Sequence, residues 1–311
     1  FMNQTIYHRT PLLKSYHHDQ LGRNVFYKMD CFQPSGSFKI RGMEYLCRQL
    51  IAEGHRQFIA SSGGNAGYSL AYVGQQLSVE IKVVVPETTP AMMVNRIRML
   101  GASVEVHGAD WNAAHQHASA ISASEDIPYV PPFDHELLWQ GHASVITECA
   151  EVMNAPDTVV VSVGGGGLLN GVLLGMQQCG WQSKVITAET HGAASFAAAY
   201  EAGKTVRLDR IDTIATSLGA RQVSEKSLEL SRSFQVVPHV ISDATALTAC
   251  ELLLKEANSL VEPACGAALS YAYGLPPEET AENILVIVCG GVCMDFDLFS
   301  QYQQRMIAKP G

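Results

Sequence analysis

Short apolar runs alternate with amphipathic segments along almost the whole chain, and few folds accommodate such a pattern. The runs that predict strands are 25–28, 58–61, 81–85, 103–106, 158–163, 184–188 and 284–289. The segments that predict helices are 65–77, 90–100, 110–124, 168–179 and 243–258. Pro90 is expected at the first position of its helix, where a missing N–H costs nothing. This alternation is typical of α/β proteins with parallel strands.

Two breaks in the pattern suggest domain boundaries. The chain has 311 residues, which is enough for two lobes. Turn-forming residues gather between Cys31 and Ser37, and prolines interrupt residues 128–133. We therefore predict a discontinuous large domain, residues 1–31 plus 134–311, with a small domain, residues 32–133, inserted into it. Each domain should contain a mainly parallel open sheet flanked by helices.

Composition argues against several classes of partner. The formal net charge of -9 disfavours nucleic acid and anionic membrane surfaces. The apolar run 284–289 is too short to span a bilayer, and the N-terminus shows no signal-peptide pattern. The 8 cysteines form no C-x-x-C pair, which favours reduced thiols in a cytoplasmic compartment.

Two histidine pairs, His17-His18 and His115-x-His117, are the nearest candidates for transition-metal ligands. No acidic or thiol partner stands at ligand spacing in the sequence. Both pairs are therefore expected to be solvated polar positions.

The most informative short segment is Ser35-Gly36-Ser37-Phe38-Lys39. Apolar residues follow it at helical spacing, so it should open a helix with Ser37 as N-cap and Lys39 in the first turn. Burial beside Phe38 and the helix dipole should both lower the pKa of the Lys39 amine. A neutral amine condenses with a carbonyl, which predicts Schiff-base chemistry, most economically with pyridoxal phosphate (PLP). The alternative is an exposed lysine at a helix start.

Two glycine-rich segments lie between a predicted strand and a predicted helix. The first, residues 61–67, reads Ser-Ser-Gly-Gly-Asn-Ala-Gly, and its helix start offers free N–H groups to a phosphate or a carboxylate. The second, residues 164–167, is a run of four glycines that could wrap one phosphate. It lacks the Lys-Ser/Thr ending of a P-loop, but Glu189 stands near the spacing of a dinucleotide fingerprint, so that reading stays open.

Two further segments carry weaker signals. Cys289 and Gly290 follow the apolar run at the end of the predicted strand, where open α/β sheets place ligands. Taken alone, Cys289 is more often a small buried apolar residue. The segment 261–266, with Pro263 and small residues, should start a helix close to a surface.

These segments, in this order, resemble the fold-type II PLP enzymes. More narrowly, they are similar to the short, liver-type L-serine/L-threonine dehydratases. The resemblance runs from about Thr10 to Gly291 through the strings S-G-S-F-K-I-R-G, S-S-x-G-N-A-G, S-V-G-G-G-G-L-L, V-E-P-A-C-G-A-A-L and V-I-V-C-G-G. It implies a tryptophan synthase β-like fold, with a large PLP-binding domain and a small domain that holds the substrate carboxylate. It also implies a homodimer.

The resemblance implies a role for each matching position. Lys39 would carry PLP as a Schiff base, Phe38 would pack against the ring, and Cys289 would face the ring nitrogen. The other implied cofactor-binding positions are Asn65, Gly164, Gly165, Gly166, Gly167, Leu168, Ser217 and Gly290. The implied substrate-carboxylate positions are Ser62, Gly63, Asn65 and Ala66. A monovalent cation such as potassium would lie among Gly164, Glu189, Ala193, Ser195, Leu218 and Ala220.

The implied reaction is β-elimination, which converts L-serine to pyruvate or L-threonine to 2-oxobutanoate, with release of ammonia. A neutral thiol at Cys289 would leave the ring nitrogen largely unprotonated, which favours loss of a β-hydroxyl. Lys39 would remove the Cα proton. Alternatives on the same scaffold are serine racemisation, dehydration of threo-3-hydroxyaspartate or phenylserine, and β-replacement. Alternatives of another class are a dinucleotide-binding oxidoreductase and a non-catalytic PLP-binding protein.

Overall fold

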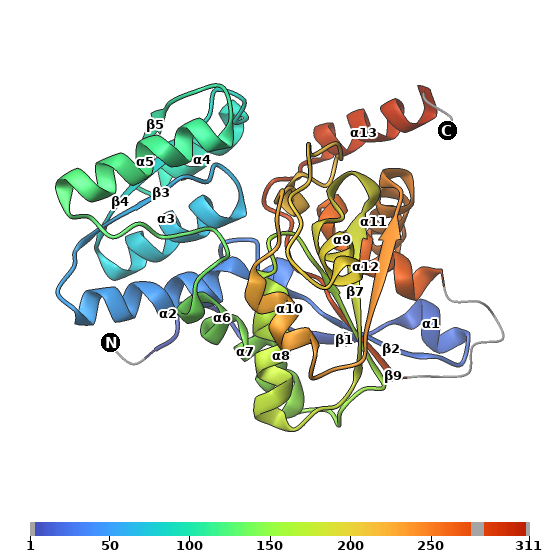
Figure 1. The fold of residues 1–311 in the computed structure, drawn as a ribbon. Coiled ribbons are helices and arrows are strands. Elements are labelled where there is room, and N and C mark those ends of the chain that lie inside the picture. The colour runs from blue at the N-terminus through green and yellow to red at the C-terminus, as the bar shows by residue number, and fades with distance from the viewer. Residues whose placement is uncertain (1–3, 275–282, 309–311) are drawn as a thin grey trace.

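The computed structural model describes residues 4–274 and 283–308, and within them the strands form two separate sheets (Figure 1). The larger sheet has the strand order β1-β2-β9-β6-β7-β8, and only its β1–β2 pair is antiparallel. Its strands are β1 (Leu12–Lys14), β2 (Asn24–Lys28), β6 (Thr158–Ser162), β7 (Lys184–Thr190), β8 (Val236–Ile241) and β9 (Asn283–Ile287). The smaller, all-parallel sheet has the order β3-β4-β5, with β3 (Gln57–Ala60), β4 (Glu80–Val85) and β5 (Ser103–Val106).

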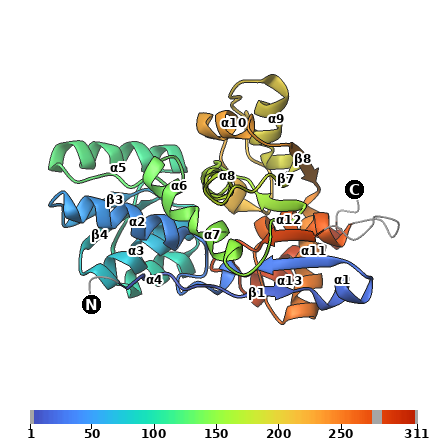
Figure 2. The same cartoon turned by 90° about the horizontal axis from the view of Figure 1, so that it is seen from below.

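Helices cover both faces of the larger sheet (Figure 2). Every residue of β6 is buried, and so are the last four residues of β9. Such strands form continuous apolar runs because neither face meets water. Apart from two helices that join the lobes, the helices of this lobe are α1 (Tyr16–Gln20), α8 (Gly167–Cys179), α9 (Ser195–Ala202), α10 (Glu225–Ser231), α11 (Asp243–Ala257), α12 (Pro263–Tyr273) and α13 (Phe296–Ala308).

The smaller sheet is also sandwiched between helices. Ala114 and Ala118 of α5 (Trp111–Glu125) pack on one face, against Ile59 and Val84. The other face packs on α2 (Lys39–Ala52), α3 (Asn65–Leu77) and α4 (Ala91–Met99). The expected α/β architecture with two mainly parallel, helix-flanked sheets is therefore confirmed.

Two short helices, α6 (Glu136–His142) and α7 (Ser144–Ala150), connect the lobes. Helix α6 contacts both α2 and α8. Its Leu138 and Trp139 belong to the apolar core of the small lobe, although they follow the boundary predicted at residue 133. The boundaries at 31/32 and 133/134 stay a prediction.

All five predicted helices and all seven predicted strands are present, with ends that differ by at most two residues. One expectation about a helix start is wrong. Pro90 is the N-cap of α4 rather than its first residue, and its extended ψ of 133° places it outside the helix. No helix in residues 4–274 or 283–308 has both the length and the apolar character to cross a membrane.

A buried ion-pair network fixes the start of α2. The Arg41 guanidinium donates to Asp30 at 2.7 and 2.9 Å and to Glu148 at 2.6 and 2.9 Å, and Lys28 bonds Glu148 at 2.5 Å. The side chains of Arg41 and Asp30 are fully buried. Burial alone would raise the pKa of Asp30, but the charge and hydrogen bonds of Arg41 outweigh it and hold that pKa below its usual value. The network therefore ties α2 to both η1 (Asp30–Phe32) and α7.

We predict that Arg41→Met lowers the free energy of unfolding by about 3–5 kcal/mol, because it leaves the fully buried Asp30 carboxylate without its main partner and leaves Glu148 with Lys28 alone. The matched control is Lys255→Met, which removes a pair with Glu251 whose lysine side chain is 67% exposed. That control should change the free energy of unfolding by less than about 1 kcal/mol. Urea unfolding of both variants measures the difference, and equal losses would contradict this role of the network.

Candidate functional site

The Lys39 segment and the end of β9 lie side by side. The N–H of Phe38 donates to the Cys289 carbonyl at 2.9 Å, and the N–H of Gly291 donates to the Gly36 carbonyl at 2.9 Å. Ser37 and Gly290 form an antiparallel bridge between these two bonds. The structure thus brings together two segments that the sequence separates by about 250 residues.

Lys39 is the first residue of α2, as expected, but the residue that caps this helix is not the expected one. The N-cap is Phe38, with no side-chain cap hydrogen bond, and the Ser37 hydroxyl lies 3.4 Å from Ser69 Oγ instead. The helix begins only after Phe38, and the Ser37 hydroxyl lies toward Ser69 of α3. The expectation that Ser37 caps α2 is therefore wrong.

The Lys39 amine sits in a partly buried site. Its Nζ donates to the Pro132 carbonyl at 2.5 Å and lies 5.1 Å from the centre of the Phe38 ring. Burial lowers the pKa of Lys39 to about 8, against a smaller opposing effect of Cys289. A substantial fraction of the amine is therefore neutral near pH 8, and this form is nucleophilic.

Cys289 lies at the end of β9 with 7% of its surface exposed. Its Sγ is 3.2 Å from the Sγ of Cys265, a second buried thiol at the start of α12. Burial raises the pKa of Cys265 well above its ordinary value, so this neighbour stays a neutral thiol. All 8 cysteines of the chain are free.

Asn65 points at the other lobe from the first position of α3. Its Nδ2 donates to both carboxylate oxygens of Glu262, at 2.9 and 3.0 Å, and to Ser217 Oγ at 3.3 Å. Ser217 also donates to Glu262. The Oδ1 of Asn65 is buried without a protein partner, which leaves an acceptor available to a ligand.

The segment that precedes α3 presents backbone N–H groups. The first N–H groups of a helix, here including those of Asn65 and Ala66, lack an intrahelical acceptor. The N-cap of α3 is Gly64, which has no side chain to accept from them. Ser62 and Gly63 are half-buried. One turn further on, Ser69 Oγ lies 2.9 Å from Ser35 Oγ, which holds α3 against the Lys39 segment.

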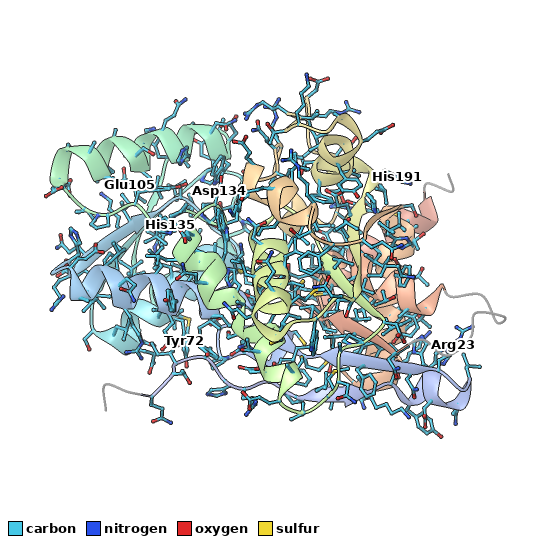
Figure 3. The ribbon with its side chains drawn as sticks, turned by 60° about the horizontal axis from the view of Figure 1, so that its bottom comes forward. Arg23, Tyr72, Glu105, Asp134, His135 and His191 are labelled. Carbon is cyan, nitrogen blue, oxygen red and sulfur yellow. The ribbon has the colours of Figure 1, made fainter. Side chains whose placement is uncertain are left out.

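The four glycines after β6 wind tightly into α8. Gly166 is the N-cap, with a φ of +93° that favours glycine, and a Cβ there would lie 2.1 Å from Ser227 Oγ. A Cβ on Gly165 would lie 2.4 Å from the Phe133 ring. Figure 3 shows Asp134 and His135, which follow Phe133, where the small lobe meets the large one. The N–H groups of Gly167 and Leu168 open α8 and have no intrahelical partner.

Glu189, near the end of β7, lies close to the same glycines. It is fully buried and accepts hydrogen bonds from the N–H groups of Phe196 and Ala197, both at 2.8 Å. Burial, only partly offset by these bonds, raises the pKa of Glu189 to about 7. Ser195 Oγ donates to the Gly164 carbonyl at 3.4 Å.

Of the remaining positions proposed for a cation, Leu218 lies beside Gly164, and Ala220 bonds Leu218. A Cβ on Gly164 would be 3.1 Å from the Leu218 Cα, and the N–H of Ala220 donates to the Leu218 carbonyl at 2.7 Å. Ala193 is fully buried at the end of η2 (His191–Ala193). In the described part of the chain, no basic side chain pairs with Glu189.

Sequence reasoning missed two residues beside the site. Glu262 was expected only near a helix start, yet its buried carboxylate binds Asn65 and Ser217. His142 is fully buried, stacks edge-on against Phe38 at 4.8 Å, and has no hydrogen-bond partner on either ring nitrogen. The pKa of His142 lies well below its usual value, mainly because of burial and also because of the nearby charges of Lys39 and Arg41.

The expectation for the two histidine pairs is wrong in part. His18 is buried, with its Nε2 3.1 Å from the Ala272 carbonyl and its Nδ1 2.6 Å from Ser15 Oγ. His117 has the acidic partner that the sequence spacing did not show, because its Nε2 lies 2.6 Å from Glu105 Oε1.

Comparisons with known proteins agree on one family. The profile of the family described as "Pyridoxal-phosphate dependent enzyme" matches residues 4–290. The human protein "Serine dehydratase-like" is 42% identical over 296 residues, which cover 91% of this chain and 89% of that protein. The mouse "L-serine dehydratase/L-threonine deaminase" is 42% identical over 301 residues, covering 93% and 92%.

A solved structure shows the same likeness in three dimensions. The crystal structure of a fungal L-serine ammonia-lyase from Rhizomucor miehei superposes with a TM-score of 0.91 at 38% identity, covering 97% of this chain and 99% of that one. The predicted fold type II architecture is thereby confirmed. The chain belongs to the pyridoxal-phosphate-dependent enzyme family.

Proposed function

We propose that this protein is an ammonia-lyase that uses PLP to eliminate water from L-serine, L-threonine or both, giving pyruvate or 2-oxobutanoate and ammonia. The observation that carries the proposal is the position of Lys39 at the start of α2, in a segment that backbone hydrogen bonds hold beside Cys289. Burial at this position lowers the pKa of the Lys39 amine. The names of the mouse relative and of the fungal structure support the reaction.

The residues present fit PLP. The glycine run with Leu168 offers helix N–H groups to a phosphate. The unpartnered Oδ1 of Asn65 and its Nδ2 suit a polar edge of the ring, with Ser217 beside it. Phe38 offers an aromatic face next to Lys39, and Cys289 and Gly290 lie in the segment that pairs with Ser37 and Phe38. When bound, the cofactor supplies an electron sink for the bond that breaks at Cα.

The protein's own groups then divide the work. Lys39 would hold the cofactor, and its amine, when free, would accept the Cα proton of the substrate. The N–H groups at the start of α3, with Ser62, Gly63 and Ala66, bind the substrate carboxylate. Cys289, a thiol next to the thiol of Cys265, offers no carboxylate to keep a ring nitrogen protonated, which favours loss of the β-hydroxyl.

The dinucleotide alternative gains no support from the geometry. Glu189 would have to reach a ribose hydroxyl, but it is fully buried and already accepts two backbone hydrogen bonds of its own chain. We assign to a monovalent cation instead the positions that the resemblance implies with Glu189, namely oxygens of Gly164, Ala193, Ser195, Leu218 and Ala220. The contact between Ser195 Oγ and the Gly164 carbonyl supports this assignment. We therefore include potassium or a similar ion in the proposal.

The cellular setting and assembly are part of the same proposal. Free cysteines throughout the chain suit a reducing, cytoplasmic compartment. A homodimer rests on the resemblance to the dehydratases. The division into residues 1–31 plus 134–311 and residues 32–133 is supported by sheet membership, since β3, β4 and β5 all fall in the inner segment.

We expect Lys39→Ala to lower kcat for serine and threonine by at least about a thousandfold, because it removes both the covalent attachment point and the base. The control Lys14→Ala removes an exposed lysine that pairs with the exposed Asp19 and should keep full activity. Formation of 2-oxo acid from serine, threonine and threo-3-hydroxyaspartate measures both, with circular dichroism to verify folding. Turnover that survives in a folded Lys39→Ala protein would refute the proposal.

The glycine run can be tested with two glycines that share a left-handed φ. Gly166→Ala should lower PLP affinity at least about tenfold, because the Cβ meets Ser227 and displaces the backbone around the phosphate. Gly203 has a φ of +65° with open space around it, so Gly203→Ala should cost about 1 kcal/mol of stability and leave PLP affinity unchanged. Absorbance titration of cofactor-free protein gives both affinities. Equal affinities would place the phosphate elsewhere.

The cation can be tested through the titration of Glu189. Its folded pKa lies above its unfolded value, so the folded state binds the extra proton and stability should fall as pH rises from about 5 to about 7. A bound potassium ion favours the carboxylate and should flatten this fall, whereas tetramethylammonium should not. Thermal unfolding across that pH range in both salts measures the effect, with Glu189→Gln as the insensitive control. Identical profiles for the unsubstituted protein would contradict the site.

A further inference from the structure

A second cluster of ligand-type side chains lies in the small lobe, outside the site described above. Glu105 belongs to β5, the edge strand of the smaller sheet, and His107 follows two residues later. Glu105 pairs in register with Val84, whose side chain packs against α5. Glu105 therefore faces α5, as Figure 3 shows, and strand alternation turns His107 to the same side.

Helix α5 completes the cluster with His117. Its Nε2 lies 2.6 Å from Glu105 Oε1, and its ring stacks on that of His107 with centroids 3.9 Å apart and planes 11° apart. One donor atom from each of the three residues lies within 4.8 Å of the other two. Within the described residues, no other group of three histidine, cysteine or acidic side chains meets this condition.

We propose that Glu105, His107 and His117 bind one divalent cation of the zinc class and thereby clip α5 to the edge strand. Two imidazoles and a carboxylate are ligands that zinc, nickel and copper accept, and a water would fill the remaining position. The ion would replace the hydrogen bond between His117 and Glu105. Ligands of a tetrahedral zinc ion stand roughly 3.4 Å apart, so the donor atoms need to shift and one ring has to turn.

His107 is the side chain that has to move. Lone pairs of stacked imidazoles lie in parallel planes and do not converge, so one ring must turn to share an ion with the other. His107 is exposed, whereas Glu105 and His117 are half-buried. The exposed ring can rotate about its side-chain bonds without displacing the core.

Lys82 competes with the cation for the carboxylate. Its Nζ lies 3.0 Å from Glu105 Oε2, the oxygen that does not contact His117. The lysine charge repels a divalent ion nearby, and the side chain is 31% exposed, so solvent screens the repulsion only in part. Removal of this charge should therefore strengthen metal binding at the cluster. Nonspecific binding of the metal to a histidine elsewhere on the surface would not respond to this change.

The test is calorimetric titration of the holoenzyme, freed of excess cofactor, with Zn²⁺ alone. We expect one equivalent per chain, an affinity at least about tenfold lower in His107→Ala and in His117→Ala, and an affinity about tenfold higher in Lys82→Gln. The matched control is His115→Ala. His115 lies on the same helix, but its ring bonds Tyr129 at 2.8 Å instead, so this variant should bind zinc with unchanged affinity.

Absorbance of Co²⁺ in the same protein gives a second readout, since two imidazole ligands change the spectrum of the ion. His107 is exposed, so its replacement leaves the fold intact and keeps the comparison valid. No saturable binding by the unsubstituted protein would overturn the proposal. Zinc affinity that persists in both His107→Ala and His117→Ala would overturn it as well. Neither result would bear on the proposed dehydratase reaction, which uses none of these residues.

Discussion

The short backbone bridge between the Lys39 segment and the end of β9 is the contact on which the site depends. Strand β9 lies between β2 and β6 in the middle of the larger sheet, so it is a rigid support. Lys39 opens α2, which packs in the small lobe. Two backbone hydrogen bonds therefore place the amine of one lobe against the thiol of the other. The N–H groups of α3 and α8 lie around the same junction, because Asn65 reaches Glu262 across it and Phe133 covers the glycine run.

The two basic residues at the start of α2, Lys39 and Arg41, have opposite electrostatic environments. Arg41 is buried with carboxylate partners on both sides and keeps its charge. Lys39 lies two residues earlier, where the Pro132 carbonyl is its only acceptor among the residues that the structure describes, and burial lowers the pKa of its amine. The ion pairs of Arg41 hold the helix start in place, while the lack of a carboxylate at Lys39 favours the neutral amine. Rigid placement and a reactive protonation state thus come from two residues in the first turn of one helix.

Local signals in the sequence were enough for most of the fold. Buried strands such as β6 form continuous apolar runs, and glycines mark the turns where α3 and α8 begin. Strand β8 was missed because Pro238 and His239 interrupt its apolar pattern, which an edge strand tolerates. Helix α6 was missed because it is short and its cap is the side chain of His135.

What the sequence could not provide is contact between distant segments. Glu262 and Asn65 meet only because the lobes do, and no spacing rule links them. Ser37 has the residue type of an N-cap, but its hydroxyl contacts Ser69 of α3, and α2 begins one residue later, after Phe38. His117 lacked an acidic neighbour along the chain, yet strand pairing and helix packing bring Glu105 to it. Tertiary contact overrode the local preference in each case.

Borohydride reduction of the PLP-loaded protein, followed by peptide mapping by mass spectrometry, tests the central claim most directly. Reduction makes an imine bond permanent, so the lysine that carries the cofactor is identified by its mass. The account predicts the reduced cofactor on the peptide that contains Lys39 and on no other. A cofactor found on a different lysine, or no modified peptide from protein saturated with PLP, would contradict it.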